Sequence, residues 1–131
     1  MVNKLKRIKD NWDLRVRGIE YLDSEVNKLQ MFSSETLDHW TTKAIAFYHL
    51  RKLRHDVITE FHIPGMGQGD ILDLTTHTQY EIETSQRPSF HQKRVEAYRR
   101  LGVDIVIIPV AKLPKDIPAR SKEIQRYLRP D

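Results

Sequence analysis

The chain has 131 residues, a formal net charge of +4, 39% hydrophobic residues and 31% charged residues. This length and composition indicate one globular domain that can bury a single core. Cysteine is absent, which excludes disulfides and thiolate metal sites and favours a reducing, cytoplasmic setting. No apolar run approaches ~18 residues, so we expect no membrane span, and the basic N-terminus lacks the apolar stretch of a secretory signal.

Charge is segregated along the chain. Residues 1–54 hold 11 Lys or Arg and 7 Asp or Glu, a net charge of +4. Residues 55–86 hold 6 acids and no Lys or Arg, and residues 87–131 hold 11 cations and 5 acids, a net charge of +6. This pattern predicts a phosphate-binding surface around a group of metal-binding carboxylates. The alternative is that the acids are scattered over loops and solvated.

Two helices are predicted in the first half. Residues 10–31 carry an apolar stripe with steps of three and four residues, which predicts an amphipathic helix. Ser33 and Ser34 read as the N-cap region of a second helix that runs to about Arg54. The apolar positions expected to face its core are Leu37, Trp40, Ala44, Phe47, Leu50 and Leu53.

The second half predicts four strands and two helices. Strands are expected at 57–63, 70–74, 79–84 and 103–110, the last nearly all apolar and therefore buried on both faces. A helix is expected at 89–101, with Gly102 after its end, and a short basic helix between Pro114 and Tyr127. The predicted fold is α/β, a mixed sheet flanked by helices. It forms one domain with an N-terminal helical arm (1–33), a core (34–110) and a basic C-terminal helix (111–131).

Three acids on neighbouring strands are candidate metal ligands. Glu81 and Glu83 point to one face of their strand because side chains alternate, and they lie about 7 Å apart. Asp70 opens the preceding strand after a glycine-rich loop, so a short turn brings it near them. Like charges at a buried strand repel, and a divalent cation removes that cost. Hard oxygen ligands of this kind predict Mg²⁺ or Mn²⁺.

These residues carry a resemblance to a known family. The stretch Gly69-Asp70-Ile-Leu-Asp-Leu, followed by Tyr80-Glu81-Ile-Glu83-Thr84, resembles the PD-(D/E)XK nuclease superfamily, which includes restriction endonucleases and archaeal Holliday-junction resolvases. The resemblance covers residues 35–110, with Gly69 where proline is usual. It implies a restriction-endonuclease-like core (α-β-β-β-α-β), here with an extra N-terminal helix. It also implies an endonuclease that hydrolyses phosphodiester bonds in nucleic acid, expected to be DNA.

The second half of the motif can be aligned in two ways. Glu81-Ile82-Glu83 is an E-x-E variant, and Glu83-Thr84-Ser85 is an E-x-S variant, so the motif's usual lysine is missing in both. Lys93, on the following helix, is the candidate for the water-activating cation, and Arg94 competes with it. In the expected mechanism the metal held by Asp70 and Glu83 polarises the scissile phosphate.

Further residues are assigned around this centre. Glu60 is a candidate additional metal ligand, and His39 sits where related domains often place a Glu or His. The alternative for each is an ordinary exposed or structural residue. The residues expected to contact nucleic-acid phosphates, giving salt-dependent affinity, are Arg87, Arg94, Arg99 and Arg100.

Two other readings compete with an active nuclease. The first is a catalytically inactive nucleic-acid-binding or assembly protein on a nuclease fold, which the missing lysine favours. The second is an unrelated small α/β protein whose strand acids are only solvated. A homodimer is also possible, because the apolar stripe of residues 10–31 could pair two copies or pack on its own sheet.

Overall fold

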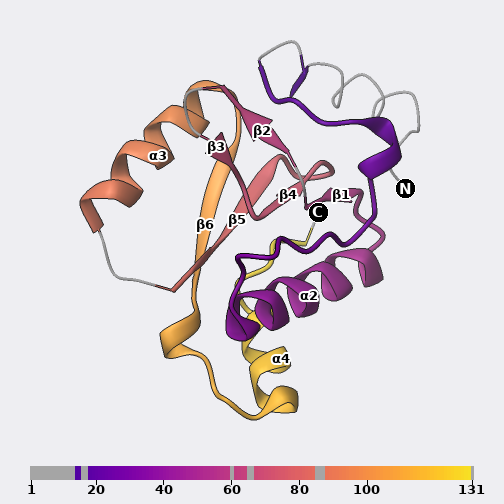
Figure 1. Cartoon of the computed structure of the whole chain (residues 1–131), viewed down its shortest axis with the longest axis vertical. Helices are drawn as coiled ribbons and strands as arrows, with labels where there is room; N and C mark the ends of the chain where they lie inside the picture. The colour runs from indigo at the N-terminus through magenta and orange to yellow at the C-terminus, as the bar shows by residue number, and fades with distance from the viewer. Residues whose placement is uncertain (1–13, 16–17, 60, 65–66, 85–87, 131) are drawn as a thin grey trace.

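The computed structural model describes residues 14–15, 18–59, 61–64, 67–84 and 88–130, without the side chains of residues 88–93. A four-stranded mixed sheet forms its centre (Figure 1). The strands are β1 (Val57–Ile58), β4 (Ile71–Asp73), β5 (Thr78–Glu83) and β6 (Asp104–Pro109), in the order β1-β4-β5-β6. None of the described helices is long and apolar enough to cross a bilayer.

The sheet combines a meander with one crossover. β1 pairs antiparallel with β4, β4 pairs antiparallel with β5, and β5 pairs parallel with β6. A separate hairpin of β2 (His62–Ile63) and β3 (Gly67–Gln68) is inserted between β1 and β4. The predicted α/β architecture with a mixed sheet is therefore confirmed.

Helices cover both faces of the sheet. Neighbouring strand residues alternate between two cores, so that Ile71 packs with α2 (Leu37–Lys52) and α4 (Ile117–Gln125), while Leu72 packs with α3 (Pro88–Arg100). Tyr98 is the fully buried residue through which α3 joins the second core. Each such aliphatic or aromatic side chain contributes roughly 1.5–3 kcal/mol when it leaves water.

Helix α2 begins later than the serines suggested. Its N-cap is Thr36, whose hydroxyl accepts a hydrogen bond from the backbone N–H of His39 at 3.2 Å. Threonine is also a capping residue, and a choice among three hydroxyls cannot be made from local preference alone. The helix ends where Arg54 adopts a left-handed φ of 64°.

The predicted apolar face of α2 is only partly right. Leu50 is buried, but Leu37 and Leu53 are exposed. The predicted buried face is wrong at these positions because α2 carries apolar residues on both of its sides. Their spacing alone does not tell which side packs against the sheet. The residues that α2 buries against the core are Thr42, Lys43, Ala46 and Leu50.

The predicted N-terminal helix over residues 10–31 is wrong for residues 18–31. Gly18 and Asn27 have positive φ values of 112° and 63°, which a right-handed helix does not allow. The segment instead runs beside β1 and β2 as an extended strap that contains a short 3-10 helix, η1 (Asp23–Glu25). Glu20 exchanges two backbone hydrogen bonds with His62, and the N–H of Asn27 donates to the carbonyl of Val57.

Two strand predictions also need correction. The run 57–63 is not one strand, because it breaks between β1 and β2. The strand 103–110 was predicted to be buried on both faces, but β6 is the last strand of the described sheet, and its residues Ile105, Val106 and Ile107 are only half-buried. Helices lie over both of its faces, which explains the apolar sequence without a neighbour on its outer side. A second 3-10 helix, η2 (Val110–Lys112), follows it.

Candidate functional site

Asp70 lies at the start of β4, facing the middle of β5. β4 and β5 are antiparallel and Ile71 pairs with Tyr80. Extending this register by one residue sets Asp70 opposite Glu81. Its Oδ2 accepts a hydrogen bond from the backbone N–H of Ile82 at 2.8 Å. Asp70 is therefore anchored to β5 by its own carboxylate, and Glu81 is the nearer of the two predicted glutamates.

Gly69 leaves no room for a side chain. A Cβ at this position would overlap the ring of Phe61 and come within 2.8 Å of the Gln79 amide. Phe61 is buried and belongs to the core on the α3 face. The close approach of these groups gives a physical reason for glycine immediately before Asp70.

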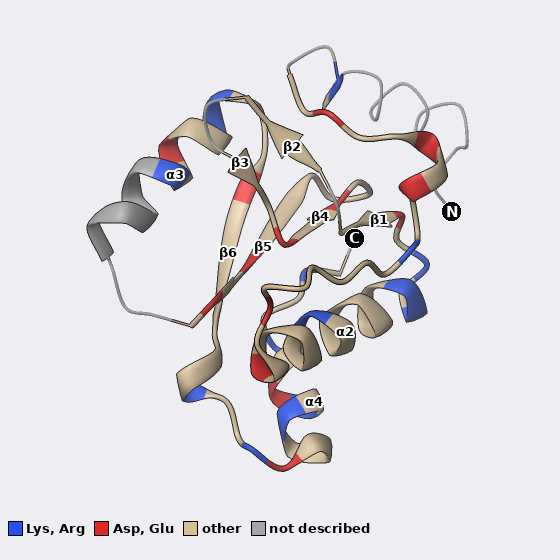
Figure 2. Ribbon diagram, viewed as in Figure 1, with Lys and Arg blue, Asp and Glu red and all other residues tan. Residues whose placement is uncertain are grey.

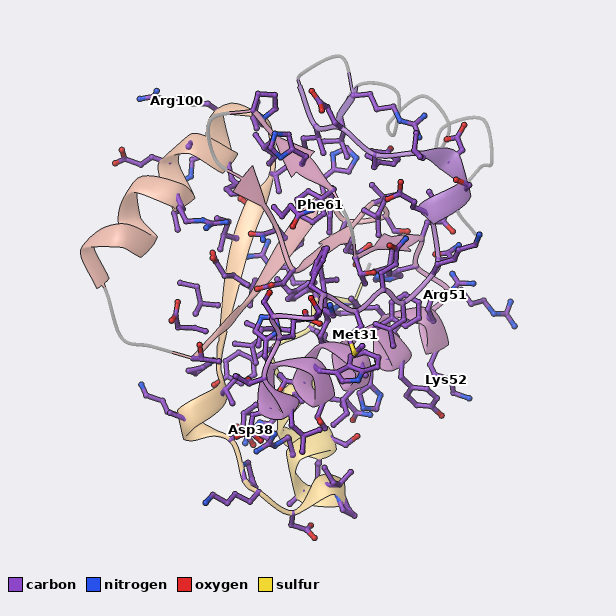
Figure 3. All side chains as sticks on the ribbon, in the orientation of Figure 1. Met31, Asp38, Arg51, Lys52, Phe61 and Arg100 are labelled. Carbon is purple, nitrogen blue, oxygen red and sulfur yellow. The ribbon has the colours of Figure 1, made fainter. Side chains whose placement is uncertain are left out.

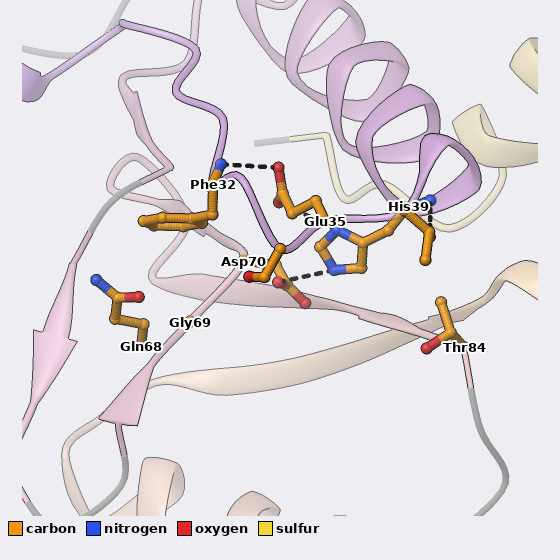
Figure 4. Close-up of a pocket in the computed structure, with 9 residues that line it drawn as sticks. Phe32, Glu35, His39, Gln68, Gly69, Asp70 and Thr84 are labelled. Atoms are coloured by element: carbon orange, nitrogen blue, oxygen red, sulfur yellow. Dashed lines mark hydrogen bonds and ion pairs between the residues drawn. The ribbon is translucent and has the colours of Figure 1, made fainter.

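His39, from the first turn of α2, links Asp70 to a second carboxylate. Its Nε2 lies 3.1 Å from Asp70 Oδ1, and its Nδ1 lies 3.1 Å from Glu35 Oε1 (Figure 4). The hydrogen bond to Asp70 raises the pKa of His39, and the charges of Asp70 and Glu35 add to this effect. Burial and the charge of Lys43 oppose it without reversing the direction.

Glu35 and Lys43 form a buried ion pair beneath His39. Lys43 Nζ lies 2.5 Å from Glu35 Oε1, and the two side chains are 0% and 6% exposed. The other oxygen of Glu35 accepts the backbone N–H of Phe32 at 3.1 Å. Sequence reasoning missed both residues as site residues. The signal was the four-residue spacing of Glu35, His39 and Lys43, because His39 and Lys43 are neighbours on one side of α2 and Glu35 lies just before its N-cap.

A cavity of about 350 Å³ opens in front of this network. It lies between the start of α2 and the strands β4 and β5, and its polar walls include Glu35, His39, Gln68, Asp70 and Thr84 (Figure 4). Two carboxylates and one imidazole therefore face a space that can admit a small polar group.

Glu81 is paired with an arginine of α3. Its Oε1 lies 3.2 Å from Arg94 Nη1, with side chains 11% and 15% exposed. Arg94 also donates to the hydroxyl of Tyr98 at 3.4 Å. Burial raises the pKa of Tyr98, Arg94 opposes this shift, and Glu81 and Asp70 both add to it. Asp70 and Glu81 thus act electrostatically on the same phenol from two strands.

The remaining predicted residues are placed as follows. Alternation puts Glu83, half-buried at the end of β5, on the side of Glu81, about 7 Å farther along the strand. Arg94 points at Glu81 rather than outward, whereas Arg99 and Arg100 are exposed at the end of α3. Glu60, Arg87 and the side chain of Lys93 lie outside the described residues, so their assignments remain predictions.

Carboxylate oxygens are the ligands that hard divalent cations prefer. Asp70 and Glu81 offer such oxygens from opposite positions on β4 and β5. Among the described residues, however, no three His, Asp or Glu side chains are grouped as metal ligands. Asp70 is held by His39, and Glu81 is held by Arg94. A cation that bound both carboxylates would have to replace these internal positive charges.

Comparisons with known proteins add no identification. No protein family, no curated protein and no solved structure matches the chain. A functional assignment therefore depends on the geometry of Asp70, Glu81 and the groups that contact them.

Proposed function

We propose that this protein is a divalent-metal-dependent nuclease that hydrolyses phosphodiester bonds in nucleic acid, with DNA as the expected substrate. The observation that carries the proposal is the register of β4 and β5, by which Asp70, in the wall of a polar cavity, comes opposite Glu81 on the neighbouring strand. The order α2, β1, β4, β5, α3, β6 is also the one that a restriction-endonuclease-like core requires. The lack of cysteine supports a cytoplasmic location as part of the same proposal.

Each side chain has a task in this proposal. Asp70 and Glu81 would hold Mg²⁺ or Mn²⁺, with Glu83 next along the strand as a further carboxylate. The chemistry that a bound divalent cation supplies is polarisation of the phosphate and acidification of a water molecule. In the hydrolysis, the water oxygen would bond to phosphorus and the water would give up a proton, while the bond to the leaving oxygen would break and that oxygen would take up a proton.

Arg94 and His39 supply positive charge beside the carboxylates. Arg94 contacts Glu81 directly, so the cation that the motif lacks on β5 can come from α3. His39 contacts Asp70 from α2. Both groups would attract a phosphate once a metal had taken their place on the carboxylates.

The second candidate function is an inactive nucleic-acid-binding or assembly protein on the same fold. What favours it is that Arg94 and His39 already neutralise Glu81 and Asp70. An internal ion pair removes the repulsion that would otherwise demand a metal. The two functions differ in whether a divalent cation binds and whether phosphodiester bonds are cut.

Calorimetric titration with Mn²⁺ and a cleavage assay test the proposal together. The substrates are plasmid, single-stranded and branched DNA and RNA, each with and without Mg²⁺ or Mn²⁺. We expect Asp70→Asn and Glu81→Gln to lose metal binding and to slow cleavage by at least about 100-fold. The matched control is Asp104→Asn, because Asp104 pairs with Thr78 at the opposite end of β5.

The outcomes separate the candidates. Metal binding and cleavage that both disappear with Asp70→Asn support a nuclease. Salt-dependent nucleic-acid binding by a parent protein that neither binds Mn²⁺ nor cuts any substrate supports the inactive alternative. Equal Mn²⁺ binding by the parent, Asp70→Asn and Glu81→Gln rules out the proposed site.

A further inference from the structure

The cavity beside Asp70 has an aromatic wall that the proposed metal chemistry does not use. Phe32 lines this cavity together with Gln68, Asp70 and Thr84, and its side chain is only half-buried. Figure 4 shows Phe32 and Gln68 on one side of Asp70 and Thr84 on the other. The volume of about 350 Å³ falls within the range of small-molecule sites. The cavity can therefore hold a ligand larger than a metal ion and its water.

The ring of Phe32 is held in position by its neighbours. The backbone N–H of Phe32 donates to Glu35 Oε2 at 3.1 Å, and its carbonyl accepts the backbone N–H of Glu35 at 3.0 Å. Lys43 Nζ lies over the ring, 5.1 Å from its centroid. Because Lys43 is fully buried, the face of the ring that it covers is closed to ligands, which leaves the opposite face for the cavity. An aromatic surface fixed in this way can stack a flat ring with little further loss of side-chain freedom.

The other walls of the cavity favour a neutral ligand that makes hydrogen bonds. Gln68, Ser34 and Thr84 all carry side-chain groups that donate and accept hydrogen bonds. The carboxylate of Asp70 accepts N–H groups, but its charge repels a phosphate that enters without a metal ion. A flat ring with donors and acceptors along its edge fits these walls, and a nucleobase is such a ring.

We propose that this cavity binds one unpaired nucleobase, stacked on Phe32 with its edge toward Gln68. The inference rests on the proposed function, because Asp70 in the same wall is assigned to the metal that meets the phosphate. A nucleotide carries its base one sugar away from its phosphate, so a phosphate at the metal and a base in the cavity can belong to one strand. A base inside a duplex must leave its stack to enter a cavity, and an unpaired base does so at the lowest cost. The substrate class is therefore single-stranded, branched or bulged nucleic acid rather than intact duplex.

Binding measured in EDTA tests the cavity in the absence of cleavage. The probes are two labelled DNA duplexes of equal length, one with a single bulged adenosine and one in which the bulged position is abasic. Both carry the same phosphates, so the ratio of their affinities isolates the contribution of the base. We expect the parent to bind the adenosine bulge at least about fivefold more tightly, as base–aromatic stacking requires. Phe32→Leu, which removes the aromatic ring, and Gln68→Met, which removes the amide, should each bring this ratio toward one.

Tyr48→Leu is the matched control for the loss of an aromatic ring. Tyr48 also has a lysine ammonium near its ring, with Lys52 Nζ 5.9 Å from the centroid, but it does not line the cavity. Lys52 lies at the end of α2, whereas the cavity lies at the start of this helix (Figure 3). The control should leave the affinity ratio unchanged. Circular dichroism melting shows whether each variant remains folded, and exposed Gln68 provides a test that does not disturb the core.

The outcomes separate this inference from the proposed function. Equal affinities of the parent for the two probes overturn the inference, as does a ratio that Phe32→Leu and Gln68→Met leave unchanged. A parent that prefers the bulged adenosine but cuts no substrate in Mg²⁺ or Mn²⁺ supports the base site and refutes nuclease activity. Metal-dependent cleavage by a parent that shows no preference for the bulged adenosine supports the nuclease and refutes the base site.

Discussion

Lys43 holds the polar network of the candidate site together at the residue scale. Its ammonium group is fully buried, and Glu35 is its ion-pair partner at 2.5 Å. The rings of Phe32 and Trp40 lie 5.1 and 5.8 Å from it and exclude water from one side. A buried lysine of this kind is tolerated only because a carboxylate accompanies it.

Replacing Lys43 with methionine should therefore destabilise the protein. The buried carboxylate of Glu35 would lose its ammonium partner, and we expect a loss of about 3 kcal/mol in the free energy of unfolding, measured by urea denaturation. The double variant Lys43→Met with Glu35→Gln should recover most of this loss, because both charges are then removed. A loss below about 1 kcal/mol in the single variant would show that the pair does not carry the expected energy.

His39 gives the site a pH response. Its pKa is raised chiefly by the hydrogen bond to Asp70, so the charged imidazolium stabilises the folded protein. That stabilisation is complete below about pH 6.5, the pKa in the unfolded chain, and is lost as pH rises through the raised folded value. We expect an NMR titration of the imidazole to give a pKa above the ordinary value.

Asp70→Asn tests whether Asp70 is the cause of the raised pKa of His39. It removes the charge but keeps the shape, so the pKa of His39 should fall. In His39→Gln, the decline in stability above about pH 6.5 should become shallower. A His39 pKa that is the same in the parent and in Asp70→Asn would contradict the assigned contact.

At the scale of elements, the N-cap of α2 positions the cavity. Thr36 satisfies the N–H of His39, which begins the helical turn that aims His39 at Asp70. Thr36→Ala should cost about 1 kcal/mol of stability, seen as a lower urea midpoint. Ser33→Ala is the control, because Ser33 is exposed and precedes the cap. Equal losses in both variants would mean that Thr36 is not the cap.

Elements with a clear local period could be predicted from the sequence. The alternation of Tyr80 and Glu81 correctly sends Tyr80 into the core with α2 and Glu81 toward α3, because strand geometry is local. The order of β1, β4, β5, α3 and β6 follows from the same kind of pattern, as does the place of Asp70 at the head of β4.

Other features depend on contacts between distant segments. The spacing of apolar residues in 10–31 predicted a helix, but the positive φ values of Gly18 and Asn27 are incompatible with one. The hydrogen bonds between Asn27 and Val57 that hold this segment extended form only in the folded chain. The pairing of Glu81 with Arg94 is likewise set by where α3 packs. Leu37 was predicted to lie in the core because the spacing of apolar residues reveals a helical stripe, but not which element packs against that stripe.

At the scale of the whole molecule, basic residues lie on helices that flank the acidic strand β5. Figure 2 shows acidic segments on β5 and basic segments on α3 and at the end of α2. Arg99 and Arg100 form the exposed basic end of α3, on the helix that also carries Arg94 to Glu81. A nucleic-acid backbone that follows α3 toward the site would meet these two guanidinium groups first.

We therefore predict salt-dependent binding of nucleic acid through the end of α3. Affinity should fall steeply between about 50 and 200 mM salt, because each neutralised phosphate releases counterions. The double variant Arg99→Gln and Arg100→Gln should reduce the slope of log affinity against log salt by about 1.8, as two lost phosphate contacts require. Fluorescence anisotropy with a labelled duplex measures the slope.

A control variant removes two positive charges from a different part of the surface. Lys122 and Arg126 are exposed on and just after α4, so Lys122→Gln with Arg126→Gln lowers the net charge equally without touching α3. If the basic end of α3 is the contact, this control should leave the slope nearly unchanged. Equal slopes in both double variants would show that affinity follows net charge alone. Because neither pair contacts Asp70 or Glu81, Mn²⁺ binding should be the same in both variants, which separates phosphate contact from the metal site.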